Sequence, residues 1–338
     1  MMGLPTRPLG TTGMDITRVG FGAWAIGGGG WAFGWGPQDD EESIAAIRHA
    51  VELGINWIDT AAAYGLGHSE EVVRRALEPY SAADRPYVFT KCGLVWDDDD
   101  RAAPPRRVGS PDSLRREADA SLRRLGVDRI DLFQLHWPPE DGTPVEDYWA
   151  ALVDLREEGK VRAVGLSNHD VPALEAAEKV GHVDSLQPHF SAITRDAAAD
   201  LLPWCAGHDT GVIVYSPMES GLLTGAFDAD RVAGLPDDDW RRNSPAFTRD
   251  LDANLAVARE LREVGRRHGQ SQAAAAVAWT LGWPGVTGAI VGARRPDQVD
   301  GWLAAAALEL DTTDYATVAA AITRAAAGSG PLAPSGRE

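Results

Sequence analysis

The sequence predicts a single (β/α)8 TIM barrel, and two observations support this prediction. Short apolar segments rich in β-branched residues alternate with amphipathic segments rich in Ala, Glu and Arg, as is typical of βα units around a parallel sheet. The apolar segments number eight, which is the strand number of a closed (β/α)8 barrel. We place the strands at residues 19–24, 55–60, 87–92, 130–136, 161–167, 183–190, 211–216 and 288–292.

The ends of the remaining elements follow from short polar signals. Residues 5–17 precede the first barrel strand and contain two glycines at a turn, so we expect a β-hairpin that closes the amino-terminal face of the barrel. Helix starts are predicted where a capping residue precedes a helical pattern, and helix ends where a glycine follows one. The starts are Ser69, Ser110 and Asp170, and the ends are Gly54, Gly126, Gly159 and Gly181.

Three loops are longer than a barrel requires: 24–38, 93–110 and 217–248. Each follows a predicted strand, which places all three on the carboxyl-terminal face, where barrel enzymes bind their substrates. We expect residues 1–327 to form one domain. The tail at 328–338 is rich in Gly, Ser and Pro and is predicted to be disordered.

Composition excludes several classes of partner. The 338-residue chain has a formal net charge of −18, which would repel nucleic acids and anionic membranes. Its two cysteines are too few for a disulfide framework. Its first residues lack the basic region and apolar stretch of a signal peptide, and about 18 consecutive apolar residues occur nowhere in the sequence. We therefore expect a cytoplasmic protein with no nucleic-acid or membrane partner.

Four polar residues are candidates for acid–base chemistry. Asp59, Lys91 and His136 end three successive predicted strands, and Tyr64 follows in the loop after the first of them. A tyrosine is normally too weak an acid to protonate a carbonyl at neutral pH, but a buried lysine beside it would lower its pKa. Asp59 would keep Lys91 charged, and His136 would hydrogen-bond the substrate oxygen.

Simpler interpretations exist for each residue taken alone. Asp59 could cap a helix, Lys91 could extend from a strand end, and His136 could belong to the core. Their coincidence on one barrel face favours a site. No metal is expected, because the clustered His or Cys ligands of a zinc centre are absent from the sequence. Gly20, Gly22 and Ala25 match the loose G-x-G-x-x-A dinucleotide pattern, but no helix can follow them at once, which disfavours a doubly wound nucleotide domain.

The motifs taken together resemble the aldo-keto reductases. The resemblance covers roughly residues 7–325, and all the motifs occur in the order seen in that family. The matching segments are 59–65, 69–70, 90–91, 131–137, 165–168, 187–188, 215–217, 221–225 and 290–294.

The resemblance implies roles for individual positions and NADP(H) as the cofactor. Asp59, Tyr64, Lys91 and His136 match the catalytic tetrad. Ser167, Asn168 and Gln187 match the residues that hold the nicotinamide carboxamide, and Tyr215 matches the ring stacked on the nicotinamide. Arg294 and Gln298 match the adenosine end, where a guanidinium suits a 2′-phosphate. The other expected cofactor contacts are Trp24, Ser216, Pro217, Met218, Gly221, Leu222, Gly225 and Gly292. Trp302 aligns where the family often has an Asn that holds the adenine.

The expected function is NADPH-dependent reduction of aldehydes or ketones to alcohols, with Tyr64 as the proton donor. The same fold also suggests a nucleotide-sensing regulatory subunit with little turnover, and a metal-dependent barrel hydrolase is a third possibility. The small-molecule carbonyl substrate, the direction of the reaction and the oligomeric state are left open by the sequence.

Overall fold

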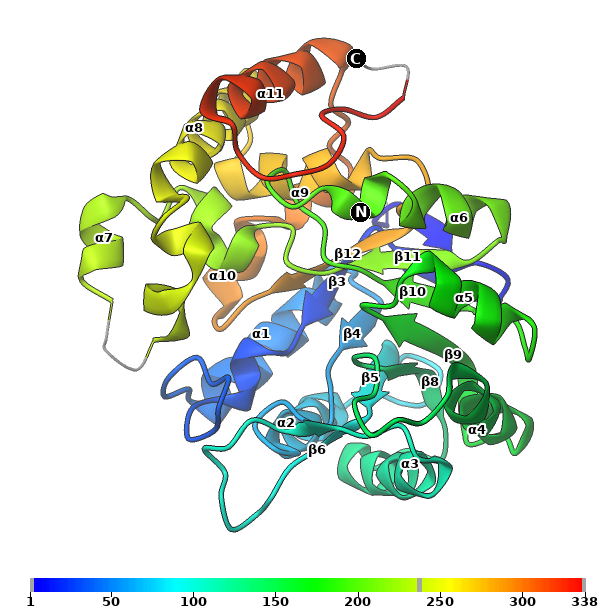
Figure 1. Ribbon diagram of the computed structural model, residues 1–338. Helices are drawn as coiled ribbons and strands as arrows, with labels where there is room; N and C mark the ends of the chain where they lie inside the picture. Colours follow the sequence, from blue (N-terminus) through cyan, green and yellow to red (C-terminus); the bar gives the residue numbers. More distant parts are fainter. Residues whose placement is uncertain (1–2, 236–238, 336–338) are drawn as a thin grey trace.

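The computed structural model, which describes residues 3–235 and 239–335, contains the closed barrel that the sequence predicts (Figure 1). Its parallel strands follow the order β10-β11-β12-β3-β4-β5-β8-β9 around the barrel. They are β3 (Val19–Gly22), β4 (Trp57–Asp59), β5 (Tyr87–Cys92), β8 (Ile130–Leu135), β9 (Val161–Ser167), β10 (Ser185–Gln187), β11 (Gly211–Val214) and β12 (Gly288–Gly292). Each lies within or at the segment predicted for it.

Helices surround the barrel and pack their apolar faces on the outer sides of the strands (Figure 1). Those that follow the first six strands are α1 (Asp40–Glu52), α2 (His68–Leu77), α3 (Pro111–Leu125), α4 (Val145–Glu157), α5 (Val171–Glu178) and α6 (Leu201–Gly207). The later ones are α7 (Ala229–Ala233), α8 (Leu251–Arg267), α9 (Gln272–Leu281), α10 (Pro296–Asp300) and α11 (Thr312–Ala325). Within the described residues, no helix is long and apolar enough to cross a membrane.

The amino-terminal hairpin closes one end of the barrel, as predicted. Strands β1 (Thr6–Pro8) and β2 (Asp15–Thr17) pair antiparallel. Leu9, Met14 and Ile16 from this hairpin form a buried cluster with inward-facing barrel residues that include Trp57. A Cβ atom at Gly20 would overlap the Trp57 indole, so this glycine serves core packing rather than nucleotide binding.

Helix starts agree with the sequence at two of three positions. Asp170 accepts a hydrogen bond from the Ala173 amide and caps α5, and Ser110 lies at the N-cap of α3. The Ser69 prediction is wrong, because α2 begins at His68. The buried Ser69 hydroxyl instead donates to the Ala23 carbonyl and lies 2.9 Å from Thr60 Oγ1, joining the loops after two neighbouring strands.

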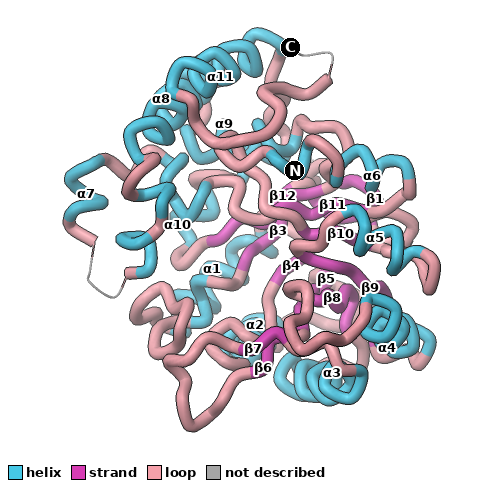
Figure 2. The backbone as a smooth tube through the Cα atoms, viewed as in Figure 1, coloured by secondary structure: helices cyan, strands magenta, loops and turns pink. Residues whose placement is uncertain are grey.

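The three long loops lie at the carboxyl ends of the strands, as predicted (Figure 2). Loop 93–110 contains a short hairpin that the sequence analysis missed, formed by β6 (Leu94–Val95) and β7 (Arg106–Arg107). Loop 217–248 contains α7 and several single 3₁₀ turns, with residues 236–238 outside the described part.

The prediction of a disordered tail is wrong for residues 328–335, whereas 336–338 lie outside the described residues. Arg195, only 1% exposed, donates to the carbonyls of Pro331, Ala327 and Ala192. Its backbone amide also bonds the Ser329 carbonyl at 3.1 Å. A Gly/Ser/Pro composition predicts disorder only when nothing binds the backbone, and here a buried guanidinium does so. We propose that the single domain extends to at least Ser335.

We expect Arg195→Met to lower the free energy of unfolding by about 1–3 kcal/mol, because the carbonyls that the guanidinium binds lose charge-assisted hydrogen bonds. Urea denaturation of the wild type and the variant measures the change. Arg249→Met is the control, since Arg249 pairs with its neighbour Asp250 at an exposed site. Equal stability of the Arg195 variant and the wild type would show that the tail contact contributes nothing.

Candidate active site

A pocket of about 1080 Å³ opens at the carboxyl ends of the strands. The three long loops and the turns after β9, β11 and β12 form its wall. Among the candidate residues, those lining it are Trp24, Asp59, Tyr64, His136, Ser167, Asn168, Gln187, Tyr215, Ser216, Pro217, Met218, Gly221, Gly292, Arg294 and Gln298. Lys91 lies directly behind this wall.

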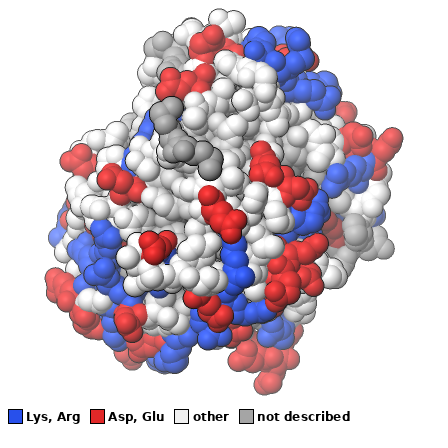
Figure 3. Space-filling model, turned by 180° about the vertical axis from the view of Figure 1, so that it is seen from behind, with Lys and Arg blue, Asp and Glu red and all other residues white. Residues whose placement is uncertain are grey.

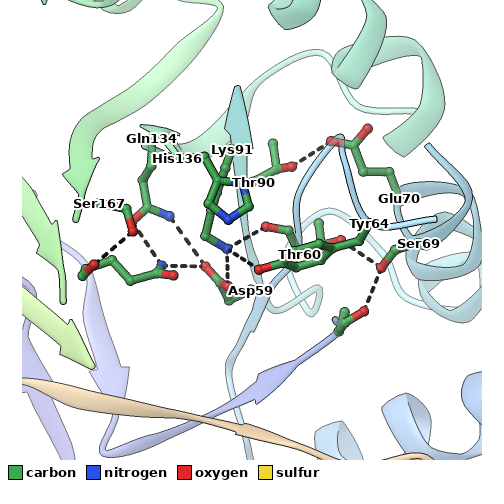
Figure 4. A network of polar contacts seen from close by, with 12 residues as sticks. Asp59, Thr60, Tyr64, Ser69, Glu70, Thr90, Lys91, Gln134, His136 and Ser167 are labelled. Atoms are coloured by element: carbon green, nitrogen blue, oxygen red, sulfur yellow. Dashed lines mark hydrogen bonds and ion pairs between the residues drawn. The ribbon is translucent and has the colours of Figure 1, made fainter. Parts of the chain in front are cut away.

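Asp59 and Lys91 form a buried ion pair at the bottom of the pocket (Figure 4). Lys91 Nζ lies 2.5 Å from Asp59 Oδ1 and 2.9 Å from the Thr60 carbonyl oxygen, and neither side chain is more than 3% exposed. Burial lowers the pKa of Lys91, and the Asp59 carboxylate opposes that shift. The pair therefore keeps an ammonium group charged where an isolated one would lose its proton.

Tyr64 places its hydroxyl oxygen 3.4 Å from Lys91 Nζ. The sequence analysis expected Lys91 to lower the pKa of this phenol, but the structure gives the opposite direction. Burial raises the pKa of Tyr64 well above 10, and the Asp59 carboxylate raises it further. Because the Lys91 ammonium is paired with the Asp59 carboxylate, its field offsets only part of the cost of a buried phenolate. Tyr64 is therefore protonated at neutral pH.

His136 faces Tyr64 edge to face, with ring centroids 5.6 Å apart. Burial lowers the pKa of His136 well below 6.5, and the positive charges of Lys91 and Arg107 lower it further. The imidazole is thus neutral at physiological pH and can both donate and accept a hydrogen bond. Its buried Nδ1 atom has no hydrogen-bond partner among the described residues.

A second buried network of hydrogen bonds lies beside Lys91 and begins at Thr90, the preceding residue on β5. It was not predicted from the sequence. Glu70, fully buried at the start of α2, accepts a hydrogen bond of 2.6 Å from Thr90 Oγ1 and another of 2.6 Å from Arg124 Nε. Its charge also favours the protonated form of Lys91 by raising the pKa of that side chain. The Ser69-Glu70 motif was the available signal.

The residues expected around the nicotinamide carboxamide do lie together. Asn168 Nδ2 donates to the His136 carbonyl and to Ser167 Oγ, and Asn168 Oδ1 accepts from the Tyr215 hydroxyl at 2.8 Å. Gln187 Nε2 donates to Asp59 Oδ2 at 2.9 Å. The Tyr215 ring stacks on His189, with centroids 4.9 Å apart, so one of its faces is supported by protein.

The loop after β11 has the irregular backbone expected of an anion-binding turn. Ser216, Glu219 and Ser220 have positive φ angles of 55°, 48° and 51°, and Gly221 follows at 97°. Two residues of the expected set lie outside the pocket wall. Leu222 is fully buried in the core, and a Cβ atom at Gly225 would lie 2.5 Å from Gln272 Oε1.

Arg294 is held at the far end of the pocket by neutral acceptors. Its guanidinium donates to Gln38 Oε1 at 2.5 Å and to the carbonyls of Trp35 and Pro37, and its backbone amide bonds Gln298 Oε1. No ion pair to Arg294 occurs within residues 3–235 and 239–335, whereas Arg241 and Arg295 pair with carboxylates nearby. Trp302, 2% exposed, lines this end where the family often has an Asn.

Aromatic side chains from two loops cover the end of the pocket near Tyr64. The Trp24 ring is roughly parallel to Tyr64 at 6.2 Å and to Trp240 at 5.9 Å, and Trp35 meets it edge on at 5.2 Å. The contribution of Trp240 was not predicted, because it lies more than 200 residues away in the sequence.

On the face seen in Figure 3, acidic and basic side chains are interspersed. Within the described residues, no group of three or more His, Cys, Asp and Glu side chains could hold a metal ion.

The fold and the site define a (β/α)8-barrel oxidoreductase. A family model described as the aldo/keto reductase family matches residues 18–323. The chain is 36% identical to the NADH-specific methylglyoxal reductase of Escherichia coli (strain K12) over 318 residues, 91% of this chain and 95% of that one. It is 32% identical to aldo-keto reductase YhdN of Bacillus subtilis (strain 168), over 86% of this chain and 85% of the relative.

A solved structure supports the same assignment. The glycerol dehydrogenase AKR11B4 from Gluconobacter oxydans superposes with a TM-score of 0.86 at 35% identity, with 98% of each chain covered. The chain therefore belongs to the aldo/keto reductase family.

Proposed function

We propose that this protein is an NADP(H)-dependent reductase of small aldehydes or ketones, with Tyr64 as the proton donor. The observation that supports the proposal most directly is the meeting of Tyr64, His136 and the Asp59–Lys91 pair at one end of a long pocket. A nicotinamide, when bound, supplies the hydride.

The pocket suits a dinucleotide. Its volume of about 1080 Å³ is at the upper end of the range for cofactor sites, and it extends from the tetrad to the arginines near α10. His136 lines one end of the pocket, where its neutral imidazole can hydrogen-bond a polar ligand atom.

Each residue of the tetrad then has a separate role in the reaction. Tyr64, held protonated by its raised pKa, donates a proton to the carbonyl oxygen. Lys91, 3.4 Å away, stabilises the phenolate left behind, and Asp59 keeps Lys91 charged. His136, neutral, hydrogen-bonds the same oxygen and orients the substrate. Trp24 shields this end from water.

The proposed preference for NADP(H) rests on the charge of Arg294. Its hydrogen bonds go to neutral acceptors, so its charge is not neutralised by a carboxylate and remains able to attract a 2′-phosphate. Burial is the largest cause of the lowered pKa of Arg294, and the positive charges of Arg241 and Arg295 lower it further. A relative described as NADH-specific makes this preference the point to test first.

We expect NADPH to bind at least ten times more tightly than NADH, and Arg294→Ala to remove most of that difference. A charge-assisted hydrogen bond contributes about 1.5–3 kcal/mol, or roughly 10- to 100-fold in affinity. Titration of both coenzymes by quenching of tryptophan fluorescence measures the dissociation constants. Arg249→Ala is the matched control, because Arg249 is exposed, pairs with its neighbour Asp250 and does not line the pocket. Equal affinities in the wild type would overturn the coenzyme preference and leave the tetrad unaffected.

A steady-state assay with a panel of aldehydes and ketones tests the function itself. Turnover supports the reductase, and tight coenzyme binding without turnover would favour a nucleotide-sensing protein. We also propose a cytoplasmic location, since Cys92 and Cys205 are free, buried thiols that need no oxidising compartment.

A further inference from the structure

Gln134 is a buried amide behind the pocket that the proposed mechanism does not use. It lies on β8 two residues before His136, opposite Lys91 on one neighbouring strand and Gly165 on the other. Its side chain is 0% exposed and does not line the pocket. A Cβ atom at Gly165 would lie 3.2 Å from Gln134 Cγ, so this glycine leaves the space that the amide fills.

Hydrogen bonds fix the orientation of two glutamine amides around Asp59. Gln187 Nε2 lies 2.9 Å and Gln134 Nε2 3.4 Å from Asp59 Oδ2, and Gln187 Nε2 also donates to Gln134 Oε1 at 3.1 Å. An ionised carboxylate only accepts hydrogen bonds, so both amide nitrogens must face Asp59. Gln187 Nε2 has two hydrogens, and it donates one to Asp59 Oδ2 and the other to Gln134 Oε1.

Gln187 lines the pocket. This arrangement leaves its Oε1 atom without a hydrogen bond among the described residues. No residue of the described chain donates a hydrogen bond to Gln187 Oε1, whereas both ends of the Asn168 amide and the Ser167 hydroxyl have partners. The pocket therefore presents a carbonyl acceptor at this point, and Asp59 and Gln134 together set the orientation of the amide from behind.

We propose that Gln134 is a positioning residue that holds Gln187 with Oε1 toward the pocket, where it accepts a hydrogen bond from the carboxamide NH2 group of the nicotinamide. The Gln187 amide would thus contact the coenzyme through Oε1 and the Asp59–Lys91 pair through Nε2. If the Gln187 amide were reversed, its oxygen would face both the Asp59 carboxylate and Gln134 Oε1, and each of these acceptors disfavours that state. The inference rests on the proposed function for the presence of a nicotinamide.

A double-mutant cycle on coenzyme binding tests the coupling. Gln134→Met keeps the volume and removes the amide, and we expect it to weaken binding of the preferred reduced coenzyme roughly three- to tenfold, the effect of one hydrogen bond. Gln187→Met should weaken it at least as much, and the double variant no more than Gln187→Met alone. Effects that multiply, or unchanged binding in Gln134→Met, would overturn the proposal.

Gln134→Glu provides a readout that a purely structural role would not change. Its buried carboxyl group beside Asp59 will have a raised pKa. While protonated, it can donate to Asp59 and accept from Gln187, so binding should be close to that of the wild type at low pH. Binding should weaken as the pH rises through that pKa, and we expect no such step in the wild type. A parallel pH dependence of both proteins would contradict the role of Gln134.

Ser185→Ala is the matched control, because Ser185 lies opposite Gly165 in the same layer of the barrel and its hydroxyl is buried without a partner. We expect unchanged binding in this variant. Thermal unfolding of each coenzyme-free variant shows whether it is folded. These binding measurements need no turnover, so a failure of the proposed reductase activity is distinguishable from a failure of the coupling.

Discussion

Tyr64→Phe is expected to lower kcat for carbonyl reduction by about 10²- to 10⁴-fold, the usual contribution of a positioned general acid. The substitution removes only the hydroxyl, whose one side-chain hydrogen bond within the described residues is the 3.4 Å contact with Lys91 Nζ. Coenzyme affinity and stability should therefore change little. Steady-state kinetics and coenzyme titration on the same preparation measure both effects.

The pH dependence of the wild type provides a second test of this assignment. The structure holds the pKa of Tyr64 above 10, so the donor form is fully present at neutral pH and is lost only as the pH rises through that value. Loss of the Tyr64 proton should therefore not lower the rate of carbonyl reduction below about pH 9. Tyr80→Phe, at a partly exposed site outside the pocket, is the control. A Tyr64→Phe enzyme with more than half of the wild-type kcat would exclude Tyr64 as the donor.

The barrel could be predicted because its physical signal is local. Each strand is a short apolar run and each helix has one apolar face, so the period of the sequence reports the structure directly. Asp59, Lys91 and His136 could be predicted for the same reason, because parallel strands of a barrel end at one face and a polar residue at each end must share it.

The contacts between distant segments could not be predicted in this way. The Glu70–Thr90–Arg124 network, the placement of Gln134 against Asp59 and the stacking of Trp240 on Trp24 each depend on side-chain packing between separate βα units. The tail was misjudged because its order depends on Arg195, more than 130 residues earlier in the chain.

The direction of the Tyr64 pKa shift could not be predicted from residue types alone, because it depends on distances and on charge pairing. A lysine beside a tyrosine suggests a lowered pKa, but the result depends on how much of the lysine charge remains after pairing. Asp59 lies 2.5 Å from Lys91 Nζ, and the phenol lies 3.4 Å from it. With the charge largely neutralised by Asp59, desolvation decides the direction.

Lys91→Met should reduce kcat at least as strongly as Tyr64→Phe, for a different reason. Without the ammonium, no positive charge stabilises the phenolate that forms when Tyr64 gives up its proton, so the barrier to proton donation rises. Asp59 would also remain as a buried carboxylate without its cation, which typically costs about 3–5 kcal/mol of folding stability. Steady-state kinetics and urea denaturation measure the two losses separately.

The pH dependence and a double variant identify the cause of the loss in stability. In Lys91→Met, burial without a cation will raise the pKa of Asp59 above its unfolded value, so the carboxyl group binds its proton more readily in the folded state. The loss of stability relative to the wild type should thus be smallest below the pKa of Asp59 in the unfolded state, near pH 4. It should grow as the pH rises through the raised pKa of the folded state. Asp59→Asn in the Lys91→Met background removes the uncompensated charge and should restore stability at neutral pH without restoring activity. Restored activity in this double variant would show that reduction does not need the ammonium, and normal activity of a well-folded Lys91→Met enzyme would contradict the proposed electrostatics directly.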